Sequence, residues 1–196
     1  MRDSLRSLLL ALLTGTLLLG SCGLAGSDGD GELPQTDSTY LRSTLNGEKE
    51  WSGKDVEVNF FNHAGLKWLT VFGNTSRGRY NETFGLSIIY EDVGSYPLIR
   101  EKYEDGFNTH YTGSRFHEAE LDALLASYSS TDDTSANQLT ITSYDSTTGI
   151  MTGTFHTTVV VDSADRVSEP GEPPRRRPDT LRFTNGEFRA KVEDRR

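Results

Sequence analysis

The stretch LTITSYDSTTGIMTGTF, residues 139–155, contains two short apolar runs separated by a polar loop. Side chains alternate between the two faces of a β-strand, so Leu139 and Ile141 are expected to share one buried face. Asp145 begins the loop, and its carboxylate is expected to order a turn by accepting local backbone hydrogen bonds, with a ligand role as the alternative. Gly153 in the second run is expected to let the returning strand bend or bulge. The stretch therefore predicts a β-hairpin.

The same pattern extends over most of the chain. Short runs rich in Val, Ile, Thr, Tyr and Phe alternate with Gly, Asn and Asp, which is typical of antiparallel strands joined by turns. Residues 40–194 are thus predicted to form a single all-β domain, either an antiparallel β-sandwich or a barrel-like domain. We expect strands at Tyr40–Leu45, Asp55–Asn62, Lys67–Gly73, Thr83–Glu91, Gly94–Ile99, Asn108–Thr112, Ala123–Ser129, Gln138–Tyr144 and Ile150–Val161, with two more near the end.

One segment is compatible with a helix. In FHEAELDALLASY, residues 116–128, the side chains of Leu121, Leu124, Leu125 and Tyr128 fall at helical spacing. A strand is the alternative, because the apolar stripe is short and the segment must lead into a strand. The domain is therefore predicted to hold at most one short helix.

The sequence LRFTNGEFRA near the end of the domain contains the pair Asn185–Gly186. An Asn-Gly pair tolerates the positive φ that both central positions of a type I′ turn require. A two-residue turn would place Phe183 opposite Phe188 on an apolar face. Arg182 would then lie opposite Arg189 on the other face, either solvated or as an anion site. The pattern predicts a closing β-hairpin.

The N-terminus has the features of a bacterial lipoprotein signal. Arg2 and Arg6 precede an apolar core, Leu8–Leu19, which is long enough for export and short for a membrane span. The core runs into LGSC, which resembles a lipobox ending at Cys22. Because Cys22 is the only cysteine, it can form no disulfide within the chain, and lipidation explains an exported thiol. We predict a signal peptide at residues 1–21 and acyl chains such as palmitate on Cys22, with an ordinary signal peptide as the alternative.

Residues 22–39 are predicted to form a lipidated, flexible tether, because they contain Gly, Ser and Asp and few apolar side chains. Acidic tethers of this kind resemble the surface-export signals of some Bacteroidetes lipoproteins, with a solvated periplasmic linker as the alternative. The formal net charge of −9 opposes binding to nucleic acid or to an anionic bilayer through the overall field. We therefore expect a cell-envelope protein held at the outer membrane by the lipid on Cys22, on the periplasmic or the surface side.

Residues 162–179 contain four of the six prolines and the triple arginine Arg175–Arg177. Proline lacks the backbone donor that a strand ladder needs, so this segment is predicted to be a loop. The arginines could bind an acidic polymer, but Glu169, Glu172 and Asp179 offset their charge. We predict an exposed Pro/Arg-rich loop.

The tail NQLTITSYDSTTGIMTGTF…LRFTNGEFRAKV, with LNGEKEW and GSYPL upstream, resembles a family of Bacteroidetes-type lipoproteins of unknown function. The shared pattern is roughly an apolar L-x-I-T, a D…G-x-x-x-G-T-F hairpin and a closing T-N-G-x-F, and it extends from about Leu41 to Val192. The resemblance implies a β-sandwich-like or barrel-like domain and supplies no catalytic residues. The Pro/Arg-rich loop departs from the simplest form of the pattern.

Signatures of the common enzyme classes are missing. The chain has no G-x-S-x-G, no H-E-x-x-H, no P-loop and no Gly-rich dinucleotide fingerprint. Its four histidines lack metal-ligand spacing, although His110 and His117 could meet across a turn with Glu118 or Glu120. We therefore predict no cofactor, no metal and no catalytic residue, which favours a protein that is not an enzyme.

Aromatic side chains supply the candidate ligand site. Trp51, Trp68 and Tyr90 could form an aromatic platform for a sugar or a peptide, with burial in the core as the alternative. We expect a lipid-anchored envelope protein that acts as a binding or structural module, with a glycan or an envelope protein as its partner. The alternative from another class is a carbohydrate-active or hydrolytic accessory enzyme whose acids meet only in the folded chain.

Overall fold

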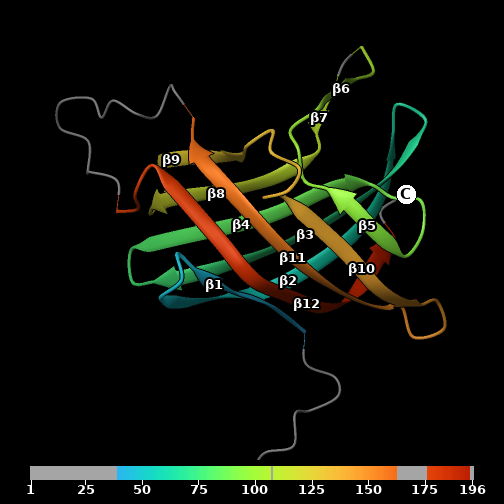
Figure 1. Ribbon diagram of the computed structural model, residues 1–196, viewed down its shortest axis with the longest axis horizontal. Helices are drawn as coiled ribbons and strands as arrows, with labels where there is room; N and C mark the ends of the chain where they lie inside the picture. The colour runs from blue at the N-terminus through green and yellow to red at the C-terminus, as the bar shows by residue number, and fades with distance from the viewer. Residues whose placement is uncertain (1–38, 107, 163–175, 195–196) are drawn as a thin grey trace, which may run out of the picture. The chain divides into compact units, whose positions relative to one another are not determined.

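Every regular element that the structure describes is a β-strand (Figure 1). The computed structural model describes residues 39–106, 108–162 and 176–194, so the predicted signal peptide, Cys22, nearly all of the tether and residues 163–175 of the Pro/Arg-rich loop lie outside the described residues. The all-β class is confirmed, and none of the described ranges contains a helix that could cross a membrane. The strands are β1 (Tyr40–Leu45), β2 (Lys49–His63), β3 (Leu66–Arg77), β4 (Tyr80–Ile89), β5 (Gly94–Pro97), β6 (Lys102–Glu104), β7 (Thr109–Tyr111), β8 (Gly113–Glu120), β9 (Ala123–Ser130), β10 (Gln138–Asp145), β11 (Ile150–Val161) and β12 (Thr180–Asp194).

The segment that was compatible with a helix forms strands instead. Strands β8 and β9 are joined by a turn in which Leu121 has a φ of 52°. Phe116 of β8 pairs with Tyr128 of β9, and both side chains are fully buried. The large aromatic residues at these paired positions stabilise the strand form, and the short apolar stripe at helical spacing does not outweigh them.

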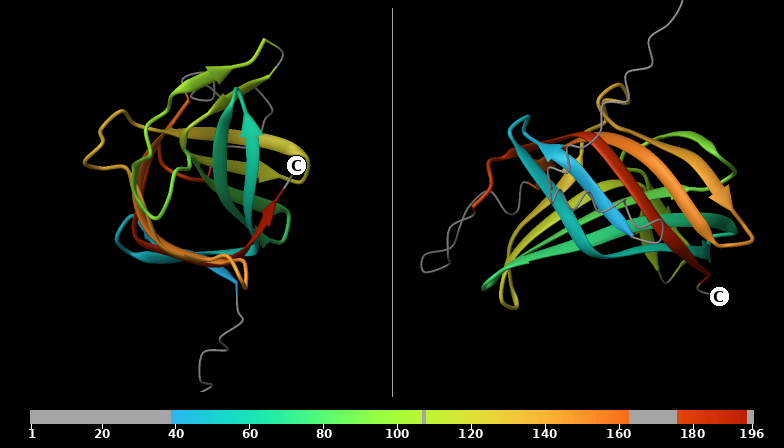
Figure 2. Two further views of the ribbon diagram at one scale, coloured as in Figure 1. Left: turned by 90° about the vertical axis from the view of Figure 1, so that its right-hand side faces the viewer. Right: turned by 90° about the horizontal axis from the view of Figure 1, so that it is seen from below.

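The main sheet closes on itself. Strand β12 pairs with β11 along one edge and with β1 and then β2 along the other, and the ring continues through β3, β4, β8 and β9 back to β11. Figure 2 shows this ring nearly end-on in its left panel. Strand β10 pairs with the first part of β11, and β5 pairs with β10. The strand pairings are antiparallel apart from the short β12–β2 contact, so the domain is barrel-like and most strand edges are paired.

Aromatic side chains fill the interior of the ring. The ring of Phe84 stacks on that of Phe183 with centroids 4.3 Å apart, and Trp51 meets Phe84 edge-on at 5.5 Å. All three side chains are buried, and each such burial contributes roughly 1.5–3 kcal/mol. The interior around Trp51, Phe84 and Phe183 is therefore a packed core.

The hairpin of residues 139–155 forms as predicted, with β10 and β11 paired antiparallel. Asp145 orders the turn: its Oδ1 accepts a hydrogen bond from the Thr147 backbone N–H at 2.8 Å, and its Oδ2 accepts one from the Thr148 hydroxyl at 2.8 Å. These bonds, led by the one from Thr148, lower the pKa of the Asp145 carboxyl. The carboxylate is thus used within the turn itself.

Gly153 lies where the interior leaves no room for a side chain. A β-carbon there would come within 2.4 Å of the Phe188 ring and 2.6 Å of the Thr140 carbonyl oxygen. The irregularity expected on the returning strand lies on the facing strand instead, between Ile141 and Ser143 of β10. The missing side chain at Gly153 leaves space for the Phe188 ring. The bulge in β10 shifts the register of the β10–β11 pairing next to it.

The predicted hairpin at Asn185–Gly186 is wrong. Residues 180–194 form one strand, β12, and Asn185 makes a bulge in it with a φ of 51°. Phe183 and Phe188 are an odd number of residues apart, so a regular strand would place them on opposite faces. The bulge turns both inward, where both are buried. Because the chain does not reverse here, the predicted pairing of Arg182 with Arg189 across a turn does not form.

Candidate ligand-binding groove

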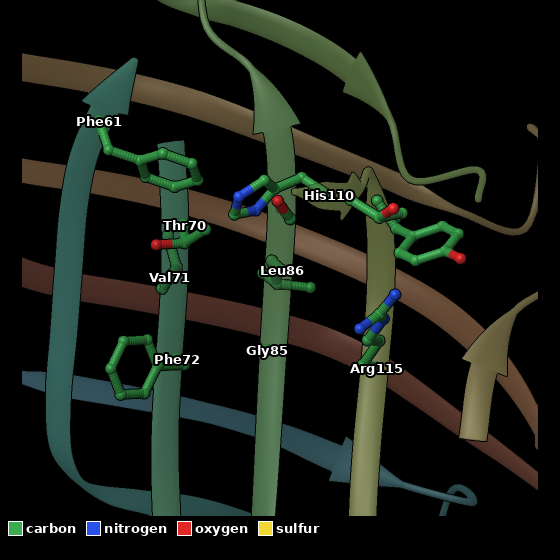
Figure 3. A pocket seen from close by; sticks show the side chains of 12 residues that line it. Phe61, Thr70, Val71, Phe72, Gly85, Leu86, His110 and Arg115 are labelled. Atoms are coloured by element: carbon green, nitrogen blue, oxygen red, sulfur yellow. The ribbon is translucent and has the colours of Figure 1, made fainter. Parts of the chain in front are cut away.

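A groove lies on the outer face of the sheet, across β2, β3, β4 and β8. Phe61 and Phe72 stand on one side of Gly85, and Arg115 stands on the other (Figure 3). His110 of β7 borders the same space. The cavity has a volume of about 380 Å³, which falls in the range of roughly 300–1,000 Å³ typical of small-molecule sites.

Gly85 provides the floor of the groove because it has no side chain. It pairs with Phe72 of β3 and with Arg115 of β8, so a large side chain flanks it on either side. A β-carbon at Gly85 would meet nothing closer than the Phe72 β-carbon at 3.7 Å, and its backbone is not among those with positive φ. The position therefore accepts other residues sterically, and glycine there serves to leave space.

The hairpin of β6 and β7, residues 102–106 and 108–111 and called the arm below, borders the groove. The rings of His110 and Tyr103 in the arm pack against Trp68 of β3, with centroid distances of 5.8 and 5.3 Å. Trp68 points outward yet is fully buried, and its indole N–H donates to the His63 carbonyl oxygen at 3.3 Å. His63 Nδ1 in turn lies 3.2 Å from a carboxylate oxygen of Asp105 in the arm. These contacts hold the arm, and hence this wall of the groove, against the sheet.

The groove carries positive charge on its β8 side. The guanidinium carbon of Arg115 lies 4.6 Å from the centroid of the Tyr111 ring, and that of Arg100 lies 4.8 Å from the same centroid. Burial, and then repulsion from Arg100, lowers the pKa of Arg115, but an arginine stays protonated at neutral pH. Of the described residues that line the groove, none is acidic. The arrangement is an apolar hollow with a cation at one side.

The arm is expected to loosen as the pH falls below 6.5. Burial, and then the neighbouring His63, lowers the pKa of His110 below its ordinary value of 6.5, with Arg115 adding to this and Asp105 opposing it. The unfolded chain therefore binds more protons in this window, so the contribution of His110 to stability is complete above pH 6.5 and is lost as the pH falls toward the folded-state pKa. Amide exchange in the arm, corrected for its intrinsic rate, should become faster as the pH is lowered from about 7.5 to about 5.5. His110→Phe should remove most of this change, and equal protection of the unmodified arm at both pH values would contradict it.

A second hollow, of about 600 Å³, lies along β10, β11 and β12. Its walls are largely polar and include Gln138, Thr140, Thr154, Thr184 and Glu187. Ligand sites are usually lined by apolar and aromatic side chains with a few placed polar groups. The groove around Gly85 has that composition and the second hollow does not.

The aromatic residues proposed from the sequence lie in three separate places. Trp51 is inside the ring, where its indole N–H donates to Glu82 Oε2 at 3.1 Å. Trp68 lies beneath the arm. Tyr90 packs on Phe60 with centroids 4.9 Å apart, and burial raises the pKa of its hydroxyl. The structure does not bring the three to one surface, and other side chains line the groove.

Two glutamates face each other at the inner side of β4 and β8. Glu82 and Glu118 are paired positions, with 9% and 1% exposure. The Glu118 carboxylate accepts the backbone N–H groups of Arg176 and Arg177 at 2.8 and 3.3 Å, and the Arg177 guanidinium lies 2.6 Å from Glu82 Oε1. Burial raises the pKa of Glu118, against the lowering effect of these two hydrogen bonds. The pair fastens the end of the Pro/Arg-rich loop, so Arg177 is part of the fold rather than a solvated charge.

The histidines that were considered as metal ligands have different surroundings. The ring of His110 lies 4.1 Å from that of His63, centroid to centroid, whereas His117 Nδ1 faces the Ser127 hydroxyl at 3.2 Å. Within residues 39–106, 108–162 and 176–194, no group of three or more His, Cys, Asp or Glu side chains is placed to hold a metal ion.

The sequence interpretation missed Gly85 and Arg115. A signal for Gly85 exists in ETFGLSIIY: the glycine falls between Phe84 and Leu86, both buried, and therefore on the outward side of a strand. Glycine at such a position marks a place where something can approach the backbone closely. Arg115 has no such signal, because its neighbours Tyr111 and Arg100 come from outside its own strand.

Comparisons with known proteins add no assignment: no family model, no curated protein and no solved structure matched the chain. The resemblance to Bacteroidetes-type lipoproteins therefore stays a prediction from the motifs, and the groove is the feature of the structure that bears on function.

Proposed function

We propose that this protein is a lipid-anchored binding module of the cell envelope whose outer groove takes a small ligand with an apolar body. The observation that supports this most is the cavity of about 380 Å³ around Gly85, bordered by Phe61, Phe72 and His110. An apolar ligand that enters it removes its own surface and that of the aromatic walls from water, at roughly 25 cal/mol per Å². Because the sheet and the packed arm preform the walls, little binding energy is lost in ordering them.

Filling the groove should abolish binding. In Gly85→Leu the new side chain extends from the floor between Phe72 and Arg115, without the backbone strain that a positive φ would add. We expect the affinity for N-phenyl-1-naphthylamine, a neutral probe that fluoresces in apolar sites, to fall by at least about tenfold. The measurement is a fluorescence titration of residues 22–196 carrying Cys22→Ser, so that no acyl chain competes with the probe.

Asn81→Leu is the matched control for this variant. Asn81 is exposed on the same strand and lies four residues from Gly85, on the same outward side and outside the groove lining. It adds the same apolar side chain without entering the groove, so its affinity should stay within about twofold of the unmodified chain. Equal affinities for Gly85→Leu and Asn81→Leu would contradict a site in the groove.

The anchor is tested separately. The signal peptide and Cys22 lie outside the described residues, and their assignment rests on the LGSC motif and the single cysteine. Two or more acyl chains hold a protein on a membrane far better than one. We expect Cys22→Ser to move the protein from the membrane fraction to the soluble envelope fraction on cell fractionation, and retention in the membrane fraction would contradict lipidation.

The hydrolytic alternative has less support. Its best candidates are Glu82 and Glu118, which face each other and of which Glu118 has a raised pKa. A general acid or base must be free to reach a proton on the substrate. Both carboxylates are instead engaged, Glu118 by the backbone of Arg176 and Arg177 and Glu82 by Arg177 and Trp51. The groove favours binding over hydrolysis.

A further inference from the structure

We infer that the ligand of the groove is a carboxylate amphiphile, a single carboxylate on a hydrocarbon body, with the carboxylate on Arg115. This inference rests on the proposed function and adds the chemical class of the ligand.

The guanidinium of Arg115 has hydrogen-bonding capacity to spare. Within the described part of the chain it makes a ring contact with Tyr111 and no hydrogen bond or ion pair. Arginine carries five N–H donors in a planar fork that matches the two oxygens of a carboxylate. Arg100, the other cation beside Tyr111, differs because its Nη1 lies 3.5 Å from a carboxylate oxygen of Asp162. The available donor in this region is therefore Arg115.

The charge around the groove is complementary to an anion. The chain has 29 acidic and 20 basic residues, yet none of the described lining residues is acidic. Against the lowering effect of burial, the negative charge of Asp162 raises the pKa of Arg115. Asp162 also pairs with Arg100, and its carboxylate accepts a hydrogen bond from the Ser129 hydroxyl at 3.4 Å. Arg115 itself is half-buried against Tyr111, so an ion pair formed there is less screened by water than one on an open surface.

Arg115 is the one arginine or lysine among the described residues that line the groove, and together with the aromatic walls it selects the ligand class. A monoanion matches one guanidinium, whereas a dianionic phosphate would favour a cluster of cations. The body of the ligand then crosses the floor at Gly85 and lies along Phe61 and Phe72, on the far side from Arg115 (Figure 3). A neutral analogue can fill the same hollow but leaves Arg115 without its partner.

Dodecanoate and dodecan-1-ol separate these two contributions, because they differ in the head group and share the chain. Each would displace N-phenyl-1-naphthylamine from residues 22–196 carrying Cys22→Ser, at pH about 8 and below the micellar range. We expect dodecanoate to bind at least about tenfold more tightly than dodecan-1-ol. In Arg115→Gln this ratio should fall to about one while the affinity for dodecan-1-ol stays unchanged, and Arg115→Lys should keep part of the ratio.

Arg79→Gln is the control, because Arg79 is an exposed arginine that pairs with Glu120 and lies outside the groove lining. Its ratio should equal that of the unmodified chain. Equal binding of the acid and the alcohol, a ratio that survives in Arg115→Gln, or tighter binding of dodecyl phosphate than of dodecanoate would each overturn the inference. If both amphiphiles bind equally and Gly85→Leu removes both, the proposed function stands and the ligand class is wrong; if neither binds, the proposed function fails as well.

Discussion

Alanine at Gly153 is expected to lower the free energy of unfolding by about 3 kcal/mol, the upper part of the range for overpacked cores. The added β-carbon would lie 2.4 Å from the Phe188 ring and 2.6 Å from the Thr140 carbonyl oxygen. The second of these is a backbone atom in the paired strand β10, so relief requires a shift of the sheet itself. Urea unfolding followed by tryptophan fluorescence measures the change.

Gly85→Ala is the matched control for this substitution, since both glycines lie within paired strands. At Gly85 the nearest atom to a β-carbon is 3.7 Å away. Alanine there should leave the stability unchanged or raise it by up to about 1 kcal/mol, because it restricts the unfolded chain without a clash. Equal loss of stability in the two variants would show that the packing around Gly153 is not as described.

Trp68→Ala is expected to destabilise the fold by about 3–5 kcal/mol, the cost typical of a buried tryptophan. The indole is fully buried between the sheet and the arm and lies against Phe61, His63, Tyr103 and His110. Its removal also frees the arm that carries one wall of the groove. We therefore expect the variant to lose affinity for N-phenyl-1-naphthylamine together with stability.

Trp68→Phe separates the two consequences. It keeps a ring beneath the arm but loses the hydrogen bond to the His63 carbonyl oxygen. The expected loss is about 1–2 kcal/mol, with the probe still bound. If Trp68→Ala left hydrogen exchange in the arm unchanged, the arm would not depend on this side chain, and Trp68 would not hold this wall of the groove against the sheet.

Strand positions could be predicted from the sequence because apolar and polar residues alternate along the strands. Strands β1 and β11 have the predicted bounds, and the turn between β10 and β11 follows from Asp145 and its local hydrogen bonds. Both signals are local: they depend on neighbours a few residues apart.

Features that depend on distant partners could not be predicted. Asn185 adopts the positive φ that its sequence suggested, but it serves a bulge, because β12 is paired on both sides, with β1 and β11, and has no reason to reverse. The contact of Arg177 with Glu82 joins residues 95 positions apart. Such pairings form only in the closed ring of strands, so no local sequence pattern predicts them.

The groove could not be predicted either, because it also depends on residues that are distant in the sequence. The ligand site predicted from the sequence consisted of the aromatic residues Trp51, Trp68 and Tyr90, all of which are buried. The groove instead depends on a missing side chain at Gly85 and on Arg115, which lies one strand away. The alternation of apolar and polar residues predicts which side chains are buried. It does not predict a hollow, because a hollow depends on side chains from several strands.

A ¹H–¹⁵N NMR titration of residues 22–196, carrying Cys22→Ser, with dodecanoate tests whether the groove is the ligand site. We expect amide shift changes concentrated at Gly85, Ser87, Gly113 and Arg115, which line the groove, and their loss in Gly85→Leu. Shift changes confined to the polar hollow around Thr154 and Thr184, or none at concentrations that saturate fluorescence displacement, would contradict a ligand site in the groove.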